Sequence, residues 1–409
     1  LIKQQFSNQE IGAFGKSIGA NSTISGKLTY DRKSTFFYGQ NTFSPANPDE
    51  NPDKQRFSTI SAEAELISNY SEKSLLDYAA SLNIYRLSNI FDASEGSVLL
   101  GGHVNKAVSL FNFGANASVD FTSTKDLAYK IGNNILRANP YVKFQSNGFT
   151  LNLGANIVQE FGETGRLNIF PAVSAEFPLA ASYAILFAGL NGDILKTSLK
   201  DLASENPYLN QNLSIRNSVE KMNLYAGLKG NAGSELGYKV MAFYKTVEDM
   251  QLFVNNPQQF KRFDVVYDNG TSNIFGLDGE ISVKASDILN ITGKAQIFNY
   301  EMASEKEAWF KPSFRLISNA RAQMNQKLFL DAELLFQGPT YGRVNSPVDG
   351  FDRYQLEGFL DLGAGAEYRV NNKIGVYLRA NNLLGQYYQQ YLHYSKLGLN
   401  VFGGLNYSF

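Results

Sequence analysis

The chain has two histidines and no cysteine, so few of its residues could support catalysis or hold a metal. Without a thiolate, cysteine catalysis, disulfides and thiolate-held metal ions are excluded. His103 lies on a predicted strand face that also carries Asn105, and Ser109 follows a few residues later. These residue types could support nucleophilic catalysis if their side chains met. We favour a hydrated histidine on a polar strand face, and we predict no catalytic residue and no enzyme activity.

The second histidine, His393, is close in sequence to three tyrosines, Tyr388, Tyr391 and Tyr394. A histidine among phenols could contact a ligand. Tyrosines near the end of a strand are more typical of an interfacial aromatic girdle or of side chains that pack a loop. We therefore expect this cluster to be structural, either as a girdle or as loop packing.

An acidic segment and two glycine pairs contain residue types found in calcium and phosphate sites, but their spacing does not match such sites. Asp49, Glu50 and Asp53 lack the regular ligand positions of a calcium loop, so a solvated loop is expected. Gly101–Gly102 and Gly403–Gly404 fall inside predicted strands instead of at a strand-to-helix turn, so they are not phosphate cradles. No metal site and no cofactor is predicted.

The remaining candidates are charged residues that alternate with apolar ones along predicted strands. Because their signs are mixed, they form neither a cation-selective nor an anion-selective ring. They are expected to face a lumen, where they either brace the wall by cross-strand pairing or line a transport path. These residues are Glu63, Glu65, Asp278, Glu280, Lys284, Lys294, Arg315, Arg321, Asp331, Glu333, Asp361, Glu367 and Arg369.

The elements that position these residues are strands with a period of two. The mean hydropathy is -0.24, and no stretch approaches the roughly 18 apolar residues of a spanning helix. In residues 397–409 the odd positions are mostly apolar and the even ones largely polar. The alternation persists for about nine or more residues, long enough for a tilted strand to cross a bilayer. The same pattern occurs at residues 60–66, 289–297, 328–337, 356–370 and 374–381.

Tight turns recur between longer polar connections along the whole chain. Tight turns are predicted at residues 19–21, 71–73, 146–148, 233–235, 324–326 and 371–372. Long connections are predicted at residues 40–55, 202–218, 255–269 and 344–354. This sidedness predicts an all-β fold, a transmembrane antiparallel β-barrel of about 18–22 strands with short periplasmic turns and long extracellular loops. Residues 1–409 are expected to form one such domain in a bacterial outer membrane.

Counting the tight turns gives about nineteen strands, whereas single-chain bacterial barrels close with an even number. Either at least one strand precedes Leu1 or the count differs by one. The chain begins with Leu instead of Met and shows no signal peptide, so we expect a mature chain or a fragment.

About a third of the chain resembles the C-terminal barrel half of TonB-dependent receptors, especially those abundant in Bacteroidota. The element Asn381–Leu384 stands where that family usually has an Asn-Leu-Phe-like sequence in its penultimate strand. The stretches that carry the resemblance are residues 272–280, 311–343, 360–388 and 397–409. The family has a 22-stranded barrel and an N-terminal plug. Here the hairpin rhythm starts within about the first twenty residues, so no plug is visible and energy-coupled import is not implied by default.

Two functions remain open. The resemblance implies receptor-like transport of a nutrient across the outer membrane. The alternative is a non-transporting barrel subunit of an outer-membrane assembly or protein-secretion complex, which the missing plug would suit. The formal net charge of -1 argues against a nucleic-acid partner. Expected partners are outer-membrane lipid, envelope proteins and, during insertion, the barrel-assembly machinery, whose recognition signal Tyr407 and Phe409 resemble.

Overall fold

The computed structural model describes residues 5–41, 43, 51–69, 76–162, 165–180, 183–346 and 350–407. These residues form 23 strands and one short helix. Nineteen strands belong to long antiparallel ladders, and the other four form two small hairpins. The predicted all-β fold and strand count are therefore confirmed for the described part. The chain divides into two compact units, which are residues 1–176, 189–224 and 246–271, and residues 177–188, 225–245 and 272–409.

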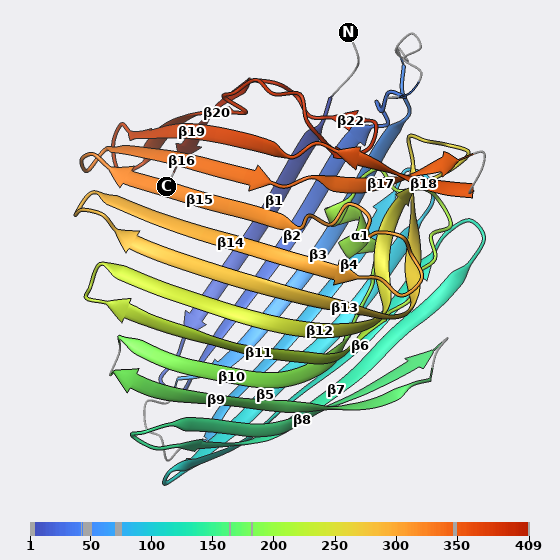
Figure 1. Cartoon of the computed structure of the whole chain (residues 1–409). Helices are drawn as coiled ribbons and strands as arrows, with labels where there is room; N and C mark the ends of the chain where they lie inside the picture. Colours follow the sequence, from blue (N-terminus) through green and yellow to red (C-terminus); the bar gives the residue numbers. More distant parts are fainter. Residues whose placement is uncertain are drawn as a thin grey trace. The chain divides into compact units, whose positions relative to one another are not determined.

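In the first unit, consecutive strands pair antiparallel from β1 to β9 and run side by side in Figure 1. Their bounds are β1 Ser7–Ile18, β2 Ser22–Phe36, β3 Lys54–Ser68, β4 Leu76–Asn89, β5 Ser94–Val108, β6 Phe111–Lys125, β7 Lys130–Gln145, β8 Thr150–Gly162 and β9 Leu167–Ala180. Strands β9 to β13 have residues in both units. The bounds of the later ones are β10 Ala184–Leu195, β11 Ser218–Ala232, β12 Leu236–Asn255 and β13 Phe263–Lys284.

In the second unit, β13 to β16 pair in order, and β16 then pairs with β19, β19 with β20 and β20 with β23. The hairpin β17–β18 lies in the connection between β16 and β19, and the hairpin β21–β22 lies in the connection between β20 and β23. The bounds are β14 Leu289–Glu301, β15 Phe314–Gln323, β16 Leu328–Gln337, β17 Thr340–Ser346, β18 Gly350–Leu356, β19 Phe359–Arg369, β20 Ile374–Asn381, β21 Gln389–Tyr391, β22 Tyr394–Ser395 and β23 Asn400–Tyr407.

On β6 the polar face is buried and the apolar face is exposed. On β6, Phe113 and Phe121 are 51% and 47% exposed, whereas Asp120 and Thr122 are 7% and 2% exposed. This is the reverse of a water-soluble sheet and is what a strand facing lipid on one side requires. We call the face that carries the shielded polar residues the inner face.

Asparagine side chains close two of the short turns that were predicted on the periplasmic side. Asn325 Oδ1 accepts hydrogen bonds from the backbone N–H groups of Lys327 and Leu328, at 2.8 and 2.9 Å. Asn371 Oδ1 does the same for Lys373 and Ile374. Asparagine favours such turns because its side chain replaces a backbone acceptor. Both turns lie where tight turns were predicted, at residues 324–326 and 371–372.

Three of the predicted long loops contain more regular structure than the sequence indicated. The expected loop 255–269 is wrong at its second half, because β13 already begins at Phe263 and pairs with the connection at Leu209. The expected loop 344–354 belongs to the β17–β18 hairpin. Loop 202–218 begins inside a helix, α1 Leu199–Glu205, capped by Ser198. Residues 42 and 44–50 of loop 40–55, and all of turn 71–73, lie outside the described residues. No helix in the described part is long and apolar enough to cross a membrane.

Candidate functional site

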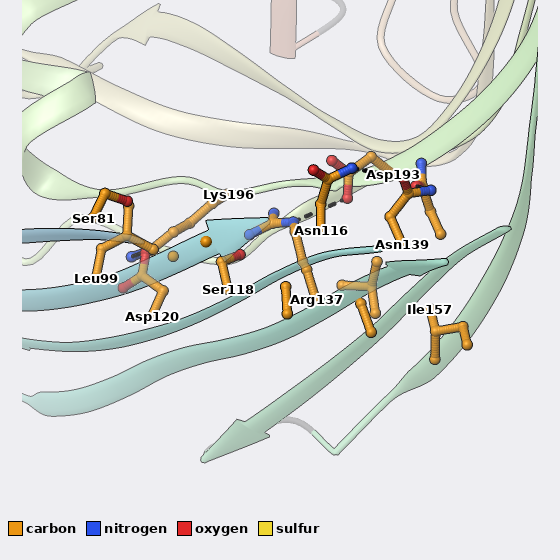
Figure 2. A pocket seen from close by; sticks show the side chains of 16 residues that line it. Ser81, Leu99, Asn116, Ser118, Asp120, Arg137, Asn139, Ile157, Asp193 and Lys196 are labelled. Atoms are coloured by element: carbon orange, nitrogen blue, oxygen red, sulfur yellow. Dashed lines mark hydrogen bonds and ion pairs between the residues drawn. The ribbon is translucent and has the colours of Figure 1, made fainter. Parts of the chain in front are cut away.

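The inner face of the first unit contains a cavity of about 490 Å³ (Figure 2). Its volume is within the usual range of small-molecule sites. The lining residues come from β4 to β8, from β10 and, at Lys196, from the residue that follows β10. Among them are Ser81, Leu99, Gly101, Asn116, Ser118, Asp120, Arg137, Asn139, Asn156, Val158, Asp193 and Lys196.

Three asparagines form a ladder across the cavity wall. Asn116 Nδ2 donates to Asn139 Oδ1 at 3.1 Å, and Asn139 Nδ2 donates to Asn156 Oδ1 at 2.7 Å. Asn156 Nδ2 donates in turn to the backbone carbonyl of Gly192 at 2.8 Å. The ladder arises because the three residues occupy facing positions on β6, β7 and β8. It gives the cavity an uncharged, hydrogen-bonding wall.

The charged side chains of the cavity are paired with each other. Lys196 Nζ lies 2.6 Å from Asp120 Oδ2 and also donates to Thr122 Oγ1 at 2.6 Å. Arg137 Nε lies 3.1 Å from Asp193 Oδ1, the contact drawn as a dashed line in Figure 2. Two cations therefore offset two anions within the cavity.

The connection between β10 and β11, residues 196–217, folds onto the inner face of the first unit. We call it the inward segment. Its two ends are flanked by an apolar cluster formed by Ile135, Val158, Phe170, Ile194 and Val219. Because β7, β8 and β9 contribute to this cluster, burial of its side chains draws the ends of the segment onto the wall.

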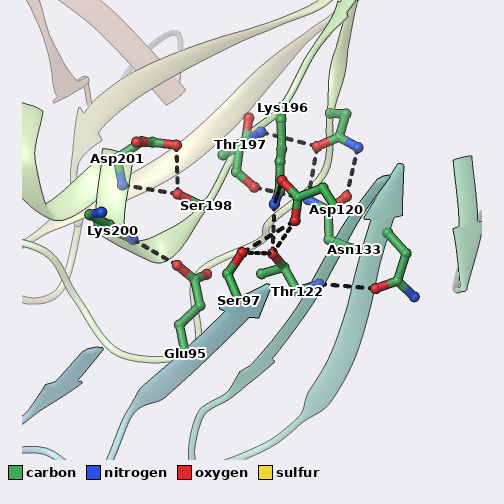
Figure 3. Close-up of polar contacts among 12 residues, drawn as sticks. Glu95, Ser97, Asp120, Thr122, Asn133, Lys196, Thr197, Ser198, Lys200 and Asp201 are labelled. Atoms are coloured by element: carbon green, nitrogen blue, oxygen red, sulfur yellow. Dashed lines mark hydrogen bonds and ion pairs between the residues drawn. The ribbon is translucent and has the colours of Figure 1, made fainter. Parts of the chain in front are cut away.

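Glu95 on β5 holds the helix of the inward segment (Figure 3). Its carboxylate, 1% exposed, accepts hydrogen bonds from the backbone N–H groups of Leu199 and Lys200 at 2.8 and 3.1 Å. It also accepts from Thr124 Oγ1 at 2.6 Å and from the Tyr85 hydroxyl at 2.8 Å. A buried carboxylate is stable only when its lone pairs are satisfied in this way.

A second buried carboxylate, Glu160 on β8, holds the other end of the inward segment. It accepts from Asn217 Nδ2 at 2.7 Å and pairs with Arg166, whose Nε lies at 2.6 Å. Asn217 also exchanges two hydrogen bonds with Asn133 on β7, at 2.8 and 2.9 Å. The segment is thus fixed at both ends by polar side chains of the wall.

The predicted charged residues of the first unit are not part of this network. Glu63 and Glu65 lie on β3, exposed, and form no ion pair in the described part of the chain. His103 Nε2 lies 3.5 Å from Asp77 Oδ2. Among the described residues no hydrogen bond joins His103 to Ser109, which sits in the β5–β6 turn with a φ of 56°.

In the second unit several predicted charges meet across neighbouring strands. Lys294 on β14 bridges Glu280 and Asp278 on β13, with Nζ–O distances of 2.7 and 3.3 Å. Arg321 and Arg369 approach Glu367 at 4.0 and 3.2 Å.

The other predicted charges of this unit have different partners. Glu333 pairs with Arg379, and Lys284 pairs with Asp287 at 2.8 Å in the short turn after β13. Arg315 and Asp331 form no ion pair within the described ranges. Whether these charges brace the wall or line a path stays a prediction.

Asp361 holds the connection between β20 and β23. Its carboxylate accepts from the Tyr388 hydroxyl at 2.6 Å and from the backbone N–H of Asn382 at 3.1 Å. The Tyr388 ring stacks on Phe359 at a centroid distance of 3.8 Å. Burial, followed by this hydrogen bond, raises the pKa of Tyr388, which keeps the phenol neutral.

The tyrosine cluster around His393 packs this connection. His393 is 6% exposed with a φ of 76°, and Tyr391 and Tyr394 are buried beside it. Tyr391 lies edge-on to Phe310 at 5.5 Å. The sequence left open whether these tyrosines form an interfacial girdle or pack a loop, and the described contacts fit loop packing.

The remaining predicted residues lie at the margins of the described structure. Tyr407 is 63% exposed on β23, and Phe409 is outside the described residues. Asp49 and Glu50 are also outside them, and Asp53 lies 3.5 Å from Arg262 Nη2. No group of three or more His, Asp or Glu side chains that could hold a metal ion occurs in the described part.

Sequence reasoning missed Glu95, Asp120, Glu160 and the asparagine ladder. The sequence does contain information that predicts one pair of the asparagine ladder. Asn139 and Asn156 are equally far from the turn at Ser146 and Phe149, so a hairpin centred on that turn places them opposite each other.

Comparison with known proteins finds similar solved structures but no similar sequence. No protein-family model and no curated protein matches the sequence. The structure is similar to P. aeruginosa FpvA bound to a heterologous pyoverdine and iron, with a TM-score of 0.72 and 11% identity over 99% of this chain and 65% of that one. The siderophore receptor PirA from Acinetobacter baumannii gives 0.72 and 11% over 99% and 71%. The FrpB iron transporter from Neisseria meningitidis gives 0.74 and 11% over 100% and 74%.

The chain therefore spans about two thirds of the FpvA chain. At these identities the similarity shows the fold alone. The predicted fold class is confirmed.

Proposed function

We propose that the chain forms a receptor-like barrel in a bacterial outer membrane and carries a nutrient across it, with the inward segment restricting passage. The observation that carries the proposal is the attachment of this segment to the inner face through Glu95 and Glu160. A wide barrel must be closed by something that can move, or it would breach the permeability barrier. The segment is held by side-chain hydrogen bonds and, in the described part of the chain, by a single β-bridge between Leu209 and Phe263 without a longer strand ladder, so it can be released locally.

The similar structures support this proposal at a coarse level. They include a siderophore receptor and an iron transporter. The paired charges of the cavity differ from a site for a free metal ion, which would need several oxygen ligands without competing cations. Iron itself is therefore not our proposed cargo.

Solute uptake into proteoliposomes tests the proposal. The double variant Glu95→Ala/Glu160→Ala should release the inward segment and speed the entry of small sugars and amino acids at least several-fold. The matched control is Glu63→Ala/Glu65→Ala, which removes two inner-face carboxylates that hold nothing in the described structure.

The alternative function predicts a different result in the same preparation. A subunit of an assembly or secretion complex would co-purify with stoichiometric envelope proteins in mild detergent. It would also stay impermeable in the double variant. That pair of results would overturn the transport proposal.

A further inference from the structure

The charged side chains of the cavity in the first unit are paired with one another. Asp120 is engaged by Lys196, and its Oδ1 also accepts from Ser97 and Thr122. Asp193 is engaged by Arg137 and by the backbone N–H of Ile194 at 2.7 Å. An ionic solute would have to break one of these pairs and leave its partner charge uncompensated.

The polar groups outside these ion pairs are neutral. Asn116, at one end of the ladder, uses one N–H and keeps its Oδ1 and its second N–H without a partner in the described structure. The hydroxyl groups of Ser81 and Ser118 have no hydrogen-bond partner among the described residues either. Amides and hydroxyls both donate and accept, so these groups match a solute whose own groups do both.

Gly101 leaves room between the two serines. A Cβ atom at this position would lie 3.0 Å from Ser81 Oγ and 3.8 Å from Ser118 Cβ. Any side chain at residue 101 would therefore enter the space that the free hydroxyls border. Leu99 and Val158, which lie on the inner face, supply apolar lining for the C–H faces of a solute.

We propose that this cavity binds a neutral, hydroxyl-rich solute, the chemistry of a sugar ring in an oligosaccharide. The inference rests on the proposed transport function and names the class of nutrient. Asn116 and the two serines hydrogen-bond the solute hydroxyls, and the asparagine ladder fixes the Asn116 amide in place. The paired charges exclude ions.

Isothermal titration calorimetry on the full chain in detergent tests the site. The neutral probes are maltotriose and raffinose, and the charged probes are citrate and spermidine. We expect at least one neutral probe to bind, with little dependence on salt. Asn116→Leu and Gly101→Val should each weaken that binding at least tenfold. Gly279→Val, on β13 in the second unit, is the control for adding a valine to a strand glycine.

The outcomes separate this inference from the transport proposal. Absence of binding by both neutral probes, equal affinity of Gly101→Val, or preferred salt-sensitive binding of a charged probe would each overturn the saccharide site. If proteoliposomes of the same preparation still pass solutes, the transport proposal survives that loss. If the probes bind as expected and no preparation passes solutes, the transport proposal fails and the binding site stands.

Discussion

The carboxylate of Glu95 accepts a 2.8 Å hydrogen bond from the backbone N–H of Leu199, a residue 104 positions later in the chain. This contact joins the wall to the first turn of α1, where backbone N–H groups lack partners within the helix. The helix is only seven residues long, and helices of this length are not stable by themselves in water. Its stability therefore depends on the wall.

Replacing Glu95 should release α1 without unfolding the strands. Glu95→Ala removes the acceptor for four donors, and each hydrogen bond to a charged group contributes about 1.5–3 kcal/mol. We expect hydrogen exchange of the Leu199 and Lys200 amides to accelerate at least tenfold. Amides of β5 should keep their protection. Unchanged exchange at α1 would show that another contact holds it.

Strand sidedness predicts which surface substitutions the barrel tolerates. Leu330 is 38% exposed on the apolar face of β16, and Asp331 lies on the inner face beside Gly365. Arginine on the lipid face at mid-membrane costs about 2–4 kcal/mol, whereas inner-face substitutions cost little. Leu330→Arg should reduce the amount of folded barrel in the membrane, and Asp331→Asn should not. Equal amounts of both would contradict the assigned faces.

Asp361 differs from Asp331. The alternation of apolar and polar residues along the strand predicts by itself that Asp361→Asn is harmless. The structure shows that Asp361 accepts from Tyr388, so we now expect the connection between β20 and β23 to loosen in this variant. Tyr388→Phe keeps the stacking on Phe359 and loses the same hydrogen bond. Both variants should be cleaved faster than the wild type by limited proteolysis in that connection. Tyr387→Phe is the control, since Tyr387 is 79% exposed.

The raised pKa of Tyr388 determines the pH range over which its hydrogen bond to Asp361 stabilises the connection. A phenol whose pKa is raised on folding contributes stability below its unfolded pKa, about 10, and loses it as the pH rises through the higher folded value. Proteolysis of the wild type should therefore be insensitive to this group throughout the neutral range. A change in cleavage with a midpoint near neutrality would exclude Tyr388 as its source.

The C-terminal signal remains a prediction with a direct test. Tyr407 is 63% exposed on β23. Deleting Phe409 should lower the yield of heat-modifiable barrel in the outer membrane. Phe409→Tyr, which keeps an aromatic residue at this position, serves as the control. Full yield from the Phe409 deletion would place the signal elsewhere.

Local pattern predicted the strands well and the site poorly, for a physical reason. Alternation and turn residues are encoded within a few positions, so β16 and the turn at Asn371 could be located from sequence. The anchor between Glu95 and Leu199 depends on how a connection packs onto a distant strand. No local spacing encodes that contact. The asparagine ladder is intermediate in difficulty. Predicting it requires only that the central turn of each hairpin is located correctly, because the turn sets which residues face each other.

Single-channel conductance tests the central claim, that the inward segment restricts passage. The chain has no cysteine, so Asn133→Cys/Asn217→Cys provides one specific pair, placed where the two native amides exchange hydrogen bonds. In the Glu95→Ala background we expect high conductance before treatment with a short thiol cross-linker and a return to the wild-type level after it. Equal conductance of wild type, released and cross-linked protein would contradict the account.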